Sequence, residues 1–510
     1  MERVHEALFD DRSLGRHQRL ADDLPAEYAL PTYLVTATTI QVVFDLLEVE
    51  YLEKFLHRLR HLVCLRISNR LRFRHKAGTS QGGAGWGLAT DRKELKMDAR
   101  DNRFDVIVAG AGYVGLAVAV GIAQARPNLS IAVVDAAPEG MWKKDTRASA
   151  IAAAATRMLD QLGCWEEIAP NAQAMTEMIV TDSRTADPVR PVLLTFDGEV
   201  APGEAFAHMV ANRDLNAALR RRAVELDIDL IEGVGVSGFE EGAQETIVHL
   251  ADGIGLRTRL LVAADGVRSR LRDMAGIRTV SWDYGQSGIV CTVHHERPHM
   301  GRAEEHFLPA GPFAILPLKP DDKGGNRSSI VWTERTEDAD RLVAEDDIVF
   351  EAELETRFGF KLGEIRVADK PRAWPLGLTL ARDFVKPRFA LAGDAAHGIH
   401  PIAGQGLNLG FKDAAALAEV VVEADRLGQD IGAIDVLERY QQWRRFDTFQ
   451  MGATTDVLNR IFSNDFGPLR AVRDFGLGLV ERMPRMKDFF IRQASGLSER
   501  APRLLRGEPI

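Results

Sequence analysis

The chain has 510 residues, about three domains at ~150 residues each, and its 64 basic and 74 acidic side chains give a net charge of −10. An acidic chain lacks the basic surface that sequence-independent nucleic-acid binding needs, so we expect no nucleic-acid partner. The three cysteines, Cys64, Cys164 and Cys291, are far apart and form no CxxC pair. This spacing argues against a disulfide framework or a zinc site and favours a cytoplasmic location.

Residues 1–96 differ in pattern from the rest of the chain. Lys54–Lys76 carries eight Lys and Arg and no acid among apolar residues, so a basic amphipathic helix on anionic lipid is one interpretation. A Gly/Ser-rich linker follows at 77–90. Because Met97 would be a natural start for a dinucleotide-binding protein, we interpret residues 1–96 as a non-native extension, with a misplaced translation start as the hypothesis.

The first strong motif is VIVAGAGYVG at 106–115. The uncharged run Val106–Ala125 is long enough to span a membrane, but its β-branched start and its glycines predict a strand, a turn and a helix instead. In the GxGxxG spacing, Gly110 permits the tight turn, Gly112 lets backbone approach a pyrophosphate, and Gly115 lets helix and strand pack closely. The N-terminus of the helix then offers free N–H groups to the phosphates.

A second strand is predicted at 130–136, and Asp135 lies near its end, twenty residues after the last glycine of the motif. An acid at this place can hold a ribose hydroxyl. EGVGVSG at 232–238 also matches GxGxxG, but another strand pattern follows it, so we assign it to a structural loop. The residues Ala150–Leu162 are predicted to form a helix.

Two later strands each end in an acidic residue. LLVAADGVRSRLR at 260–272 ends its strand at Asp265, and RFALAGDAAHGIHPIAGQGLNLGFKDA at 388–414 ends its strand at Gly393 and Asp394. Both acids can also be interpreted as caps of a following helix.

A Gly/Pro loop with Pro401 follows the second acid, and a helix is predicted over 404–425. His397 and His400 in this loop are three residues apart, which raises the question of a metal site. Because no third ligand is near, we interpret them as hydrogen-bonding residues of the loop and expect no metal.

The three motifs, GxGxxG, DGxxSxxR and GDAAHxxxPxxGQGxN in this order, resemble the single-component FAD-dependent aromatic hydroxylases related to para-hydroxybenzoate hydroxylase. Four further strings are similar to the ubiquinone-biosynthesis branch: YGQSGIVCTV at 284–293, FLPAGPFAILPL at 307–318, SSIVWT at 328–333 and WPL at 374–376. The resemblance covers about residues 103–500 and none of 1–96.

This resemblance implies a set of FAD-binding residues. The glycines of the first turn cradle the pyrophosphate, and Asp135 binds the adenosine ribose. Arg147 matches an arginine that contacts the cofactor, with an ordinary arginine at a helix start as the alternative. Arg213 matches a similar position less well, with a surface salt bridge as the alternative. The complete set is Gly110, Gly112, Gly115, Asp135, Arg147, Arg213, Asp265, Gly393, Asp394, Pro401, Gly404, Gly406 and Asn408.

Alternating strand and helix patterns after residue 97 predict an α/β architecture. We expect a Rossmann-like FAD-binding domain with an inserted β-sheet substrate domain and a helical C-terminal segment. The expected divisions are 97–173, 209–279 and 376–425 for FAD, 174–208 and 280–375 for the substrate-side sheet, and 426–510 for the C-terminal helices.

The resemblance also implies the reaction, because side chains do not activate dioxygen and a cofactor must do so. In the family, NADPH or NADH reduces FAD, O2 then adds to give a flavin hydroperoxide, and one oxygen atom passes to an electron-rich aromatic ring. A ferredoxin-type donor remains open. The expected substrate is a polyprenylated phenol of ubiquinone biosynthesis. A hydroxylase of another aromatic compound, or a non-catalytic flavoprotein scaffold, is the alternative.

A polyprenyl substrate partitions into membrane, so we expect at most a peripheral contact with the inner membrane, and a place in a biosynthetic complex is conceivable. Ile461–Leu497 places phenylalanines among Arg and Lys. A membrane-facing or partner-facing surface is one interpretation of this segment, and ordinary packing of C-terminal helices is the other. We name no catalytic base, because no side chain stands out in the predicted substrate region.

Overall fold

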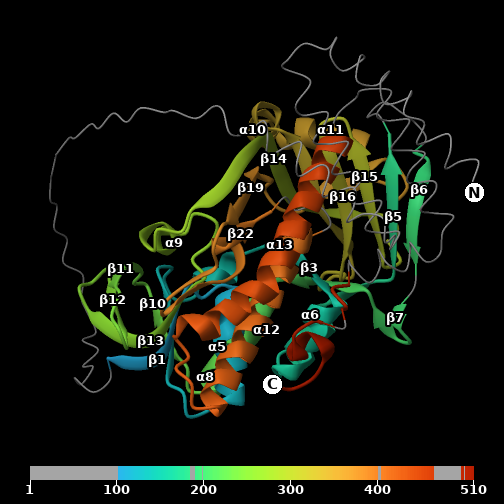
Figure 1. The fold of residues 1–510 in the computed structure, drawn as a ribbon. Coiled ribbons are helices and arrows are strands. Elements are labelled where there is room, and N and C mark those ends of the chain that lie inside the picture. The colour runs from blue at the N-terminus through green and yellow to red at the C-terminus, as the bar shows by residue number, and fades with distance from the viewer. Residues whose placement is uncertain (1–101, 184–189, 198, 400–403, 464–494, 499) are drawn as a thin grey trace, which may run out of the picture. The chain divides into compact units, whose positions relative to one another are not determined.

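The computed structural model describes residues 102–183, 190–197, 199–399, 404–463, 495–498 and 500–510. The strand and helix predicted within Val106–Ala125 are confirmed as β1 (Arg103–Ala109) and α5 (Tyr113–Ala125). β1 lies inside a largely parallel sheet with the strand order β10–β2–β1–β13–β12–β11 (Figure 1). The other strands on this path are β2 (Ile131–Asp135), β10 (Asp229–Glu232), β11 (Val236–Glu240), β12 (Thr246–Leu250) and β13 (Gly255–Ala263).

The second halves of β1 and β13 and most of β2 consist of Val, Ile, Leu and Ala and are buried, as is typical of parallel strands with helices packed over them. α12 (Gln405–Arg426) packs along α5, and α8 (Asn212–Glu225) also packs against α5. Small residues permit the close helix contact, since a Cβ atom at Gly121 would lie 3.2 Å from Cβ of Ala418. The predicted helix over 404–425 is therefore confirmed.

A second sheet is antiparallel except for one parallel pair, β5 with β15. Its strands within the described residues are β5 (Glu177–Asp182), β6 (Val192–Asp197), β14 (Thr279–His295), β15 (Arg302–Leu308), β16 (Gly311–Leu318), β17 (Asn326–Arg335), β18 (Ile365–Val367), β19 (Arg372–Ala381) and β22 (His397–Gly398).

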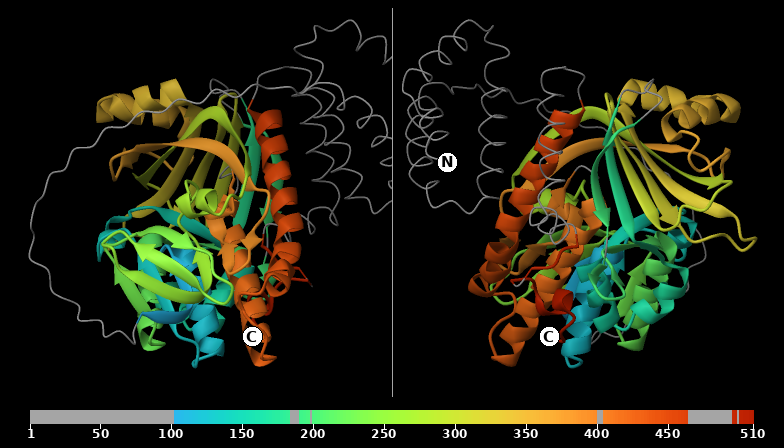
Figure 2. Two further views of the ribbon diagram at one scale, coloured as in Figure 1. Left: turned by 60° about the vertical axis from the view of Figure 1, so that its left-hand side comes forward. Right: turned by 90° about the vertical axis from the view of Figure 1, so that its right-hand side faces the viewer.

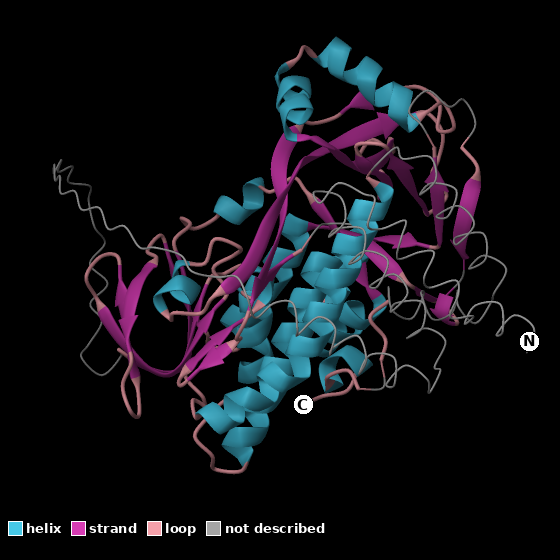
Figure 3. Cartoon of the chain, turned by 45° about the horizontal axis from the view of Figure 1, so that its top comes forward, coloured by secondary structure: helices cyan, strands magenta, loops and turns pink. Residues whose placement is uncertain are grey.

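One face of this second sheet is covered by α10 (Thr336–Ala344) and α11 (Asp347–Phe358), which Figure 3 shows beside the long strands. Trp332 and Phe313 of the sheet pack there against Phe350 of α11 in a separate hydrophobic cluster. Ala314 of β16 and Val331 of β17 alternate with these residues and therefore point to the opposite face. Figure 2 shows the two sheets one above the other, with α13 (Ile434–Phe462) alongside both.

The helix predicted over Ala150–Leu162 is partly wrong. Ala148–Ala152 forms a strand, β3, which pairs antiparallel with β9 (Ala207–Ala211) in a small sheet, and the helix α6 begins only at Ala153 and ends at Gln161. The sequence ASAIA is rich in alanine and favours helix locally. Pairing with β9 overrides that weak preference.

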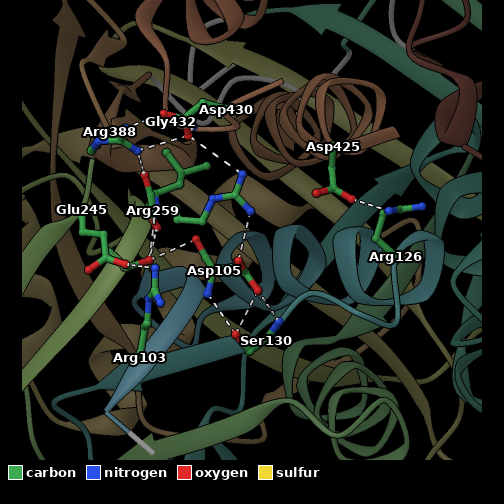
Figure 4. A network of polar contacts seen from close by, with 12 residues as sticks. Arg103, Asp105, Arg126, Ser130, Glu245, Arg259, Arg388, Asp425, Asp430 and Gly432 are labelled. Atoms are coloured by element: carbon green, nitrogen blue, oxygen red, sulfur yellow. Dashed lines mark hydrogen bonds and ion pairs between the residues drawn. The ribbon is translucent and has the colours of Figure 1, made fainter. Parts of the chain in front are cut away.

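A polar network ties together the end of the parallel sheet at which its strands begin (Figure 4). Asp105 of β1 accepts hydrogen bonds from Ser130 and from Arg259 of β13, at 2.9 and 3.1 Å. The buried guanidinium of Arg388 donates to the backbone oxygen of Arg259 at 3.1 Å and pairs with Asp430. These contacts anchor the strands at one end of the sheet and leave the other end free for a site.

Residues Met97–Ile510 form one compact unit. The finer division of Met97–Ile510 into cofactor, substrate and C-terminal domains stays a prediction. The proposals for residues 1–96, His400, Pro401 and most of Ile461–Leu497 fall outside the described residues. In the part of the chain that is described, no helix combines the length and the apolar character needed to cross a bilayer.

Candidate active site

Three of the predicted motifs meet because the strands before them are neighbours. β1 pairs with β13, and β13 pairs with β21 (Phe389–Leu391), with their last residues in register: Ala109 opposite Ala263, and Ala263 opposite Leu391. Parallel strands end at the same edge of a sheet, so the loops that begin at positions 110, 264 and 392 lie side by side. Ligands of open α/β sheets bind in the crevice at this edge.

The glycine turn has the geometry that its spacing predicts. Gly110 has φ of +113°, and a Cβ atom there would lie 2.3 Å from the backbone oxygen of Ala264. A Cβ atom at Gly115 would lie 2.0 Å from the backbone oxygen of Gly110, whereas one at Gly112 would meet no atom within 4 Å. Gly110 and Gly115 are therefore required by the turn itself. Gly112 leaves open space in front of the helix, as close approach of a phosphate group requires.

Two helix N-termini face the same cavity. α5 begins after Gly112 and α12 begins after Gly404, whose φ of +64° lies in the left-handed region. Neither first turn carries an acidic side chain, and neither cap residue has a side chain to satisfy the free N–H groups. Unsatisfied N–H groups and the helix dipole favour an anionic ligand. The residues present therefore fit a cofactor with a negatively charged pyrophosphate.

The cavity has a volume of about 1000 Å³ and runs from the glycine turn to the second sheet. Its lining includes many of the predicted cofactor residues: Gly112, Gly115, Arg147, Asp394, Gly404, Gly406 and Asn408. Gly110 and Gly393 lie just behind them in the turns. Such a volume accommodates an extended ligand, since pockets for small molecules usually measure ~300–1,000 Å³.

Arg147 is held at the cavity wall by a cluster that the sequence did not reveal. Its guanidinium donates two hydrogen bonds to Asp145, at 2.9 and 2.8 Å, and lies over the ring of Trp374, 5.5 Å from its centroid. Asp145 also accepts from the Tyr113 hydroxyl at 3.0 Å and from the Asn212 amide at 3.1 Å. Burial raises the pKa of Asp145, but the hydrogen bonds from Arg147 outweigh it and lower that pKa to about 2. The carboxylate is therefore ionised and fixes the arginine.

Replacing Arg147 with methionine is expected to raise the Kd for FAD about tenfold, because a charge-assisted hydrogen bond of ~1.5–3 kcal/mol is lost from a side chain that is 47% exposed. Titrating the apoprotein with FAD and following flavin fluorescence measures this. Arg341→Met is the matched control, because this exposed arginine of α10 pairs with Asp338 and is not part of the cavity lining, and we expect it to leave the Kd unchanged. Equal losses in both variants would contradict the assignment.

Besides Gly110 and Gly393, three of the predicted cofactor residues lie outside the cavity lining. Asp135 accepts hydrogen bonds from the backbone N–H groups of Ala111 and Ala137, at 2.6 and 2.7 Å, and so braces the glycine turn. Arg213 is 63% exposed and pairs with Asp214, which agrees with the surface alternative. Asp265 accepts a long 3.4 Å hydrogen bond from the N–H of Leu271 in the helix after it, whose cap is Ser269. Their roles in binding FAD stay predictions.

Asn408 and Asp394 line the cavity in different ways. The Asn408 amide donates to the backbone oxygens of Ala150 and Gly404, at 2.9 and 3.1 Å, and its oxygen accepts from the N–H of Ala152 at 2.9 Å. It thereby joins α12 to β3. Asp394 is open to solvent within the cavity although protein surrounds it, and burial raises the pKa of its carboxyl.

A buried ion cluster supports the loop that carries Asp394. Asp413 of α12 accepts hydrogen bonds from the N–H of Gly393 at 2.9 Å, from His397 Nε2 at 2.5 Å and from Arg444 Nε at 2.8 Å. The side chains of Asp413 and Arg444 are inaccessible to solvent. His397 therefore forms a hydrogen bond through one ring nitrogen to this carboxylate, in line with its interpretation as a hydrogen-bonding residue of the loop.

The far wall of the cavity is formed by the second sheet and is mainly apolar. The apolar residues that line this part include Met178, Pro312, Ala314, Leu316, Val331 and Leu378. Thr333 and Glu305 of the same sheet also line the cavity. An end suited to a charged cofactor and an end suited to an apolar substrate therefore belong to one cavity.

Sequence reasoning missed Asp145, Asn212 and Glu305. Asp145 lies two residues before Arg147, so the string DTR held a usable signal. Asn212 lies next to Arg213 at the start of α8. The Asn212 side chain contacts Asp145, whereas Arg213 pairs with Asp214. Glu305 lies just before the FLPAGPFAILPL string, and only the alternation of β15 places it toward the cavity.

Comparisons with known proteins agree with this geometry. A family model described as the FAD binding domain matches residues 103–445. The chain is 42% identical to the ubiquinone hydroxylase UbiL of Rhodospirillum rubrum, over 80% of this chain and 94% of that protein. It is 32% identical to the 3-demethoxyubiquinol 3-hydroxylase of Escherichia coli, over 77% of this chain and 98% of that protein.

A solved structure with the same fold is p-nitrophenol 4-monooxygenase PnpA from Pseudomonas putida DLL-E4. The TM-score is 0.63 at 19% sequence identity, and the match covers 77% of this chain and 98% of that one. At this identity the likeness establishes the fold and confirms the predicted α/β class.

Proposed function

This chain belongs to the FAD-binding family of aromatic hydroxylases, and we propose that it is an FAD-dependent monooxygenase that hydroxylates the ring of a polyprenylated phenol in ubiquinone biosynthesis. The observation that carries the proposal is the continuity of one cavity. It joins the N-termini of α5 and α12 to an apolar wall of the second sheet. The two relatives named as ubiquinone-pathway hydroxylases support the choice of substrate class.

Residues of this chain have separate tasks in the proposal. The free N–H groups behind Gly112, together with Arg147, bind the pyrophosphate, and Asp394 binds the ribityl chain. The N-terminus of α12 at Gly404 and Gly406 stabilises negative charge at the pyrimidine end of the flavin. Bound FAD supplies the acceptance of a hydride and the activation of dioxygen, which side chains do not provide. The apolar sheet wall excludes water from the reacting ring.

NADPH or NADH is proposed as the electron donor and O2 as the second substrate. The only other GxGxxG string, at 232–238, runs from the end of β10 into the start of β11 instead of opening a helix. A nicotinamide donor therefore visits the cavity without a dinucleotide domain of its own in the described part of the chain. The apolar tail of the substrate favours a peripheral contact with the inner membrane and a place in a biosynthetic complex.

The test is oxygen incorporation with purified, FAD-loaded protein. NADPH or NADH, a 2-polyprenylphenol and 18O2 are supplied, and the product is analysed by mass spectrometry. The proposal expects a product with one labelled oxygen atom bonded to a ring carbon as a new hydroxyl group. It also expects donor oxidation to be faster with the phenol than without it. If no phenol changes the rate of donor oxidation and hydrogen peroxide is the only oxygen product, the proposal is overturned and the scaffold alternative is favoured.

A further inference from the structure

Within the described residues the second sheet contributes two carboxyl groups to the cavity lining, the exposed Asp283 of β14 and the buried Glu305 of β15. Glu305 lies opposite Ala314 of β16, and Ala314 lies opposite Val331 of β17. All three residues line the cavity. On its other side Glu305 is paired with Val180 of β5. The carboxyl group is thus set among apolar neighbours in the middle of the wall.

No hydrogen bond or ion pair joins the Glu305 carboxyl to another described side chain, and burial alone raises its pKa to about 7. The residue is only 4% exposed. Its neighbours on the strand behave differently, since Glu304 pairs with Lys361 at 2.6 Å and His306 binds Thr181 at 2.6 Å on the opposite face. A buried carboxyl without a partner costs stability, so a ligand that supplies the partner is the natural reason to keep it.

A second polar group of this wall is also unsatisfied. The Thr333 hydroxyl on β17 is buried and has no hydrogen-bond partner in the described structure, and the residue lines the same cavity. Because this hydroxyl oxygen has almost no accessible surface, Thr333 shapes the wall, and Glu305 gives the apolar surface its acceptor. An acceptor set in an apolar surface suits an aromatic ring that carries a hydroxyl.

We propose that Glu305 binds the substrate, accepting a hydrogen bond from the ring hydroxyl and so fixing which edge of the ring faces the cofactor end of the cavity. The inference rests on the proposed function and adds the residue that recognises the ring hydroxyl of the substrate. Hydrogen bonding to a carboxylate shifts electron density toward the ring oxygen and its ortho and para carbons. The same contact therefore orients the ring and prepares it for attack on an electrophilic oxygen.

The expected pH dependence follows from the ionised form of Glu305 being the acceptor. Phenol binding weakens as the pH falls below about 7, because the carboxyl then carries a proton. The phenol itself stays neutral up to pH ~10. The other ionisable residues that line the cavity in the described structure are Tyr113, Arg147, Arg268, Asp283 and Asp394. Removing Glu305 alone separates its contribution from theirs.

The test compares two ligands on the FAD-loaded protein: 2-geranylphenol and its O-methyl ether. The ether has the same apolar body but no hydroxyl hydrogen to donate. At pH 8 we expect the wild type to bind the phenol ~10- to 100-fold more tightly than the ether in calorimetric titrations, as for a hydrogen bond to a charged group. Glu305→Leu is expected to abolish this preference. Glu304→Gln changes the adjacent carboxyl on the opposite face and is expected to keep it.

The outcomes separate this inference from the proposed function. If the wild type binds both ligands and Glu305→Leu still prefers the phenol, the inference fails while the function stands. If neither ligand binds the wild type, the proposed substrate class fails. If lowering the pH weakens phenol binding by Glu305→Gln as much as it weakens binding by the wild type, the Glu305 carboxyl does not cause the pH dependence, and this part of the inference fails.

A stability measurement keeps the proposal testable even if a variant binds nothing. The pKa of Glu305 rises from 4.5 in the unfolded chain to about 7 in the fold, so wild-type protein loses stability as the pH rises from 4.5 to about 7. Glu305→Gln lacks this loss. Without ligand it is expected to have the higher urea midpoint at pH 8, with a smaller difference at pH 5. A lower midpoint than wild type at pH 8 would indicate that the carboxyl has an internal partner and would overturn the proposal.

Discussion

Replacing Asp413 with alanine is expected to lower the free energy of unfolding by about 3–5 kcal/mol and to remove most of the bound FAD. The change leaves the buried guanidinium of Arg444 without its main counter-charge, and it leaves the N–H of Gly393 and one nitrogen of His397 without acceptors. Breaking one partner of a buried pair costs far more than breaking an exposed one. Because Gly393 precedes Asp394, the cofactor loop loses its support together with the fold.

Urea unfolding and the visible absorbance of the flavin measure the two effects. Asp447→Asn is the matched control, because Asp447 pairs with the same arginine at 3.0 Å but is 49% exposed. We expect that variant to lose at most ~1 kcal/mol and to stay yellow. An Asp413→Ala protein with a normal urea midpoint and full flavin content would show that the cluster does not support the site.

The pH dependence of this cluster has a definite sign. Burial raises the pKa of Asp413, but His397 and Arg444 outweigh it and the pKa is lowered below 3.8. A depressed carboxyl pKa stabilises the fold above the unfolded value and loses that effect as the pH falls through the folded value. The cluster therefore contributes fully at neutral pH and fails only in strong acid.

The motifs could be predicted from the sequence because local geometry imposes them. Gly110 needs a positive φ and Gly115 needs room for the turn, so both leave a signal that does not depend on distant residues. The acids after β13 and β21 were found for a similar reason, since each follows a short buried strand directly. What brought these motifs together was the order of neighbouring strands, and only the resemblance to a known family implied it.

The remaining parts of the site depend on contacts between distant segments. Arg444 is one of several arginines in a helix with a mixed polar and apolar pattern, and nothing local marks it as the partner of Asp413. β3 is a strand because β9 lies beside it, although alanine favours helix. Glu305 becomes a candidate for binding a ligand only because its side of the sheet lines a cavity. In each case a tertiary neighbour gives the residue its role.

The two glycines at the start of α5 provide the last and sharpest prediction. Gly115→Ala is expected to destabilise the apoprotein by about 3 kcal/mol or more, because its Cβ atom would lie 2.0 Å from the backbone oxygen of Gly110 and the turn must move. Gly112→Ala is expected to cost the apoprotein only about 1 kcal/mol, because its Cβ atom would meet nothing within 4 Å and what remains is the penalty of alanine at an N-cap.

FAD affinity is expected to reveal the effect of Gly112→Ala, which the stability of the apoprotein reveals only weakly. The added methyl group at position 112 occupies the space that a pyrophosphate needs, so a stable Gly112→Ala apoprotein is expected to bind FAD at least tenfold more weakly. Urea midpoints of the apoproteins and fluorescence titrations with FAD measure both quantities. If Gly112→Ala bound FAD as tightly as the wild type, the phosphates would have to lie away from the N-terminus of α5. The cavity would then need a different occupant at its polar end, because free N–H groups without a nearby acid favour an anion.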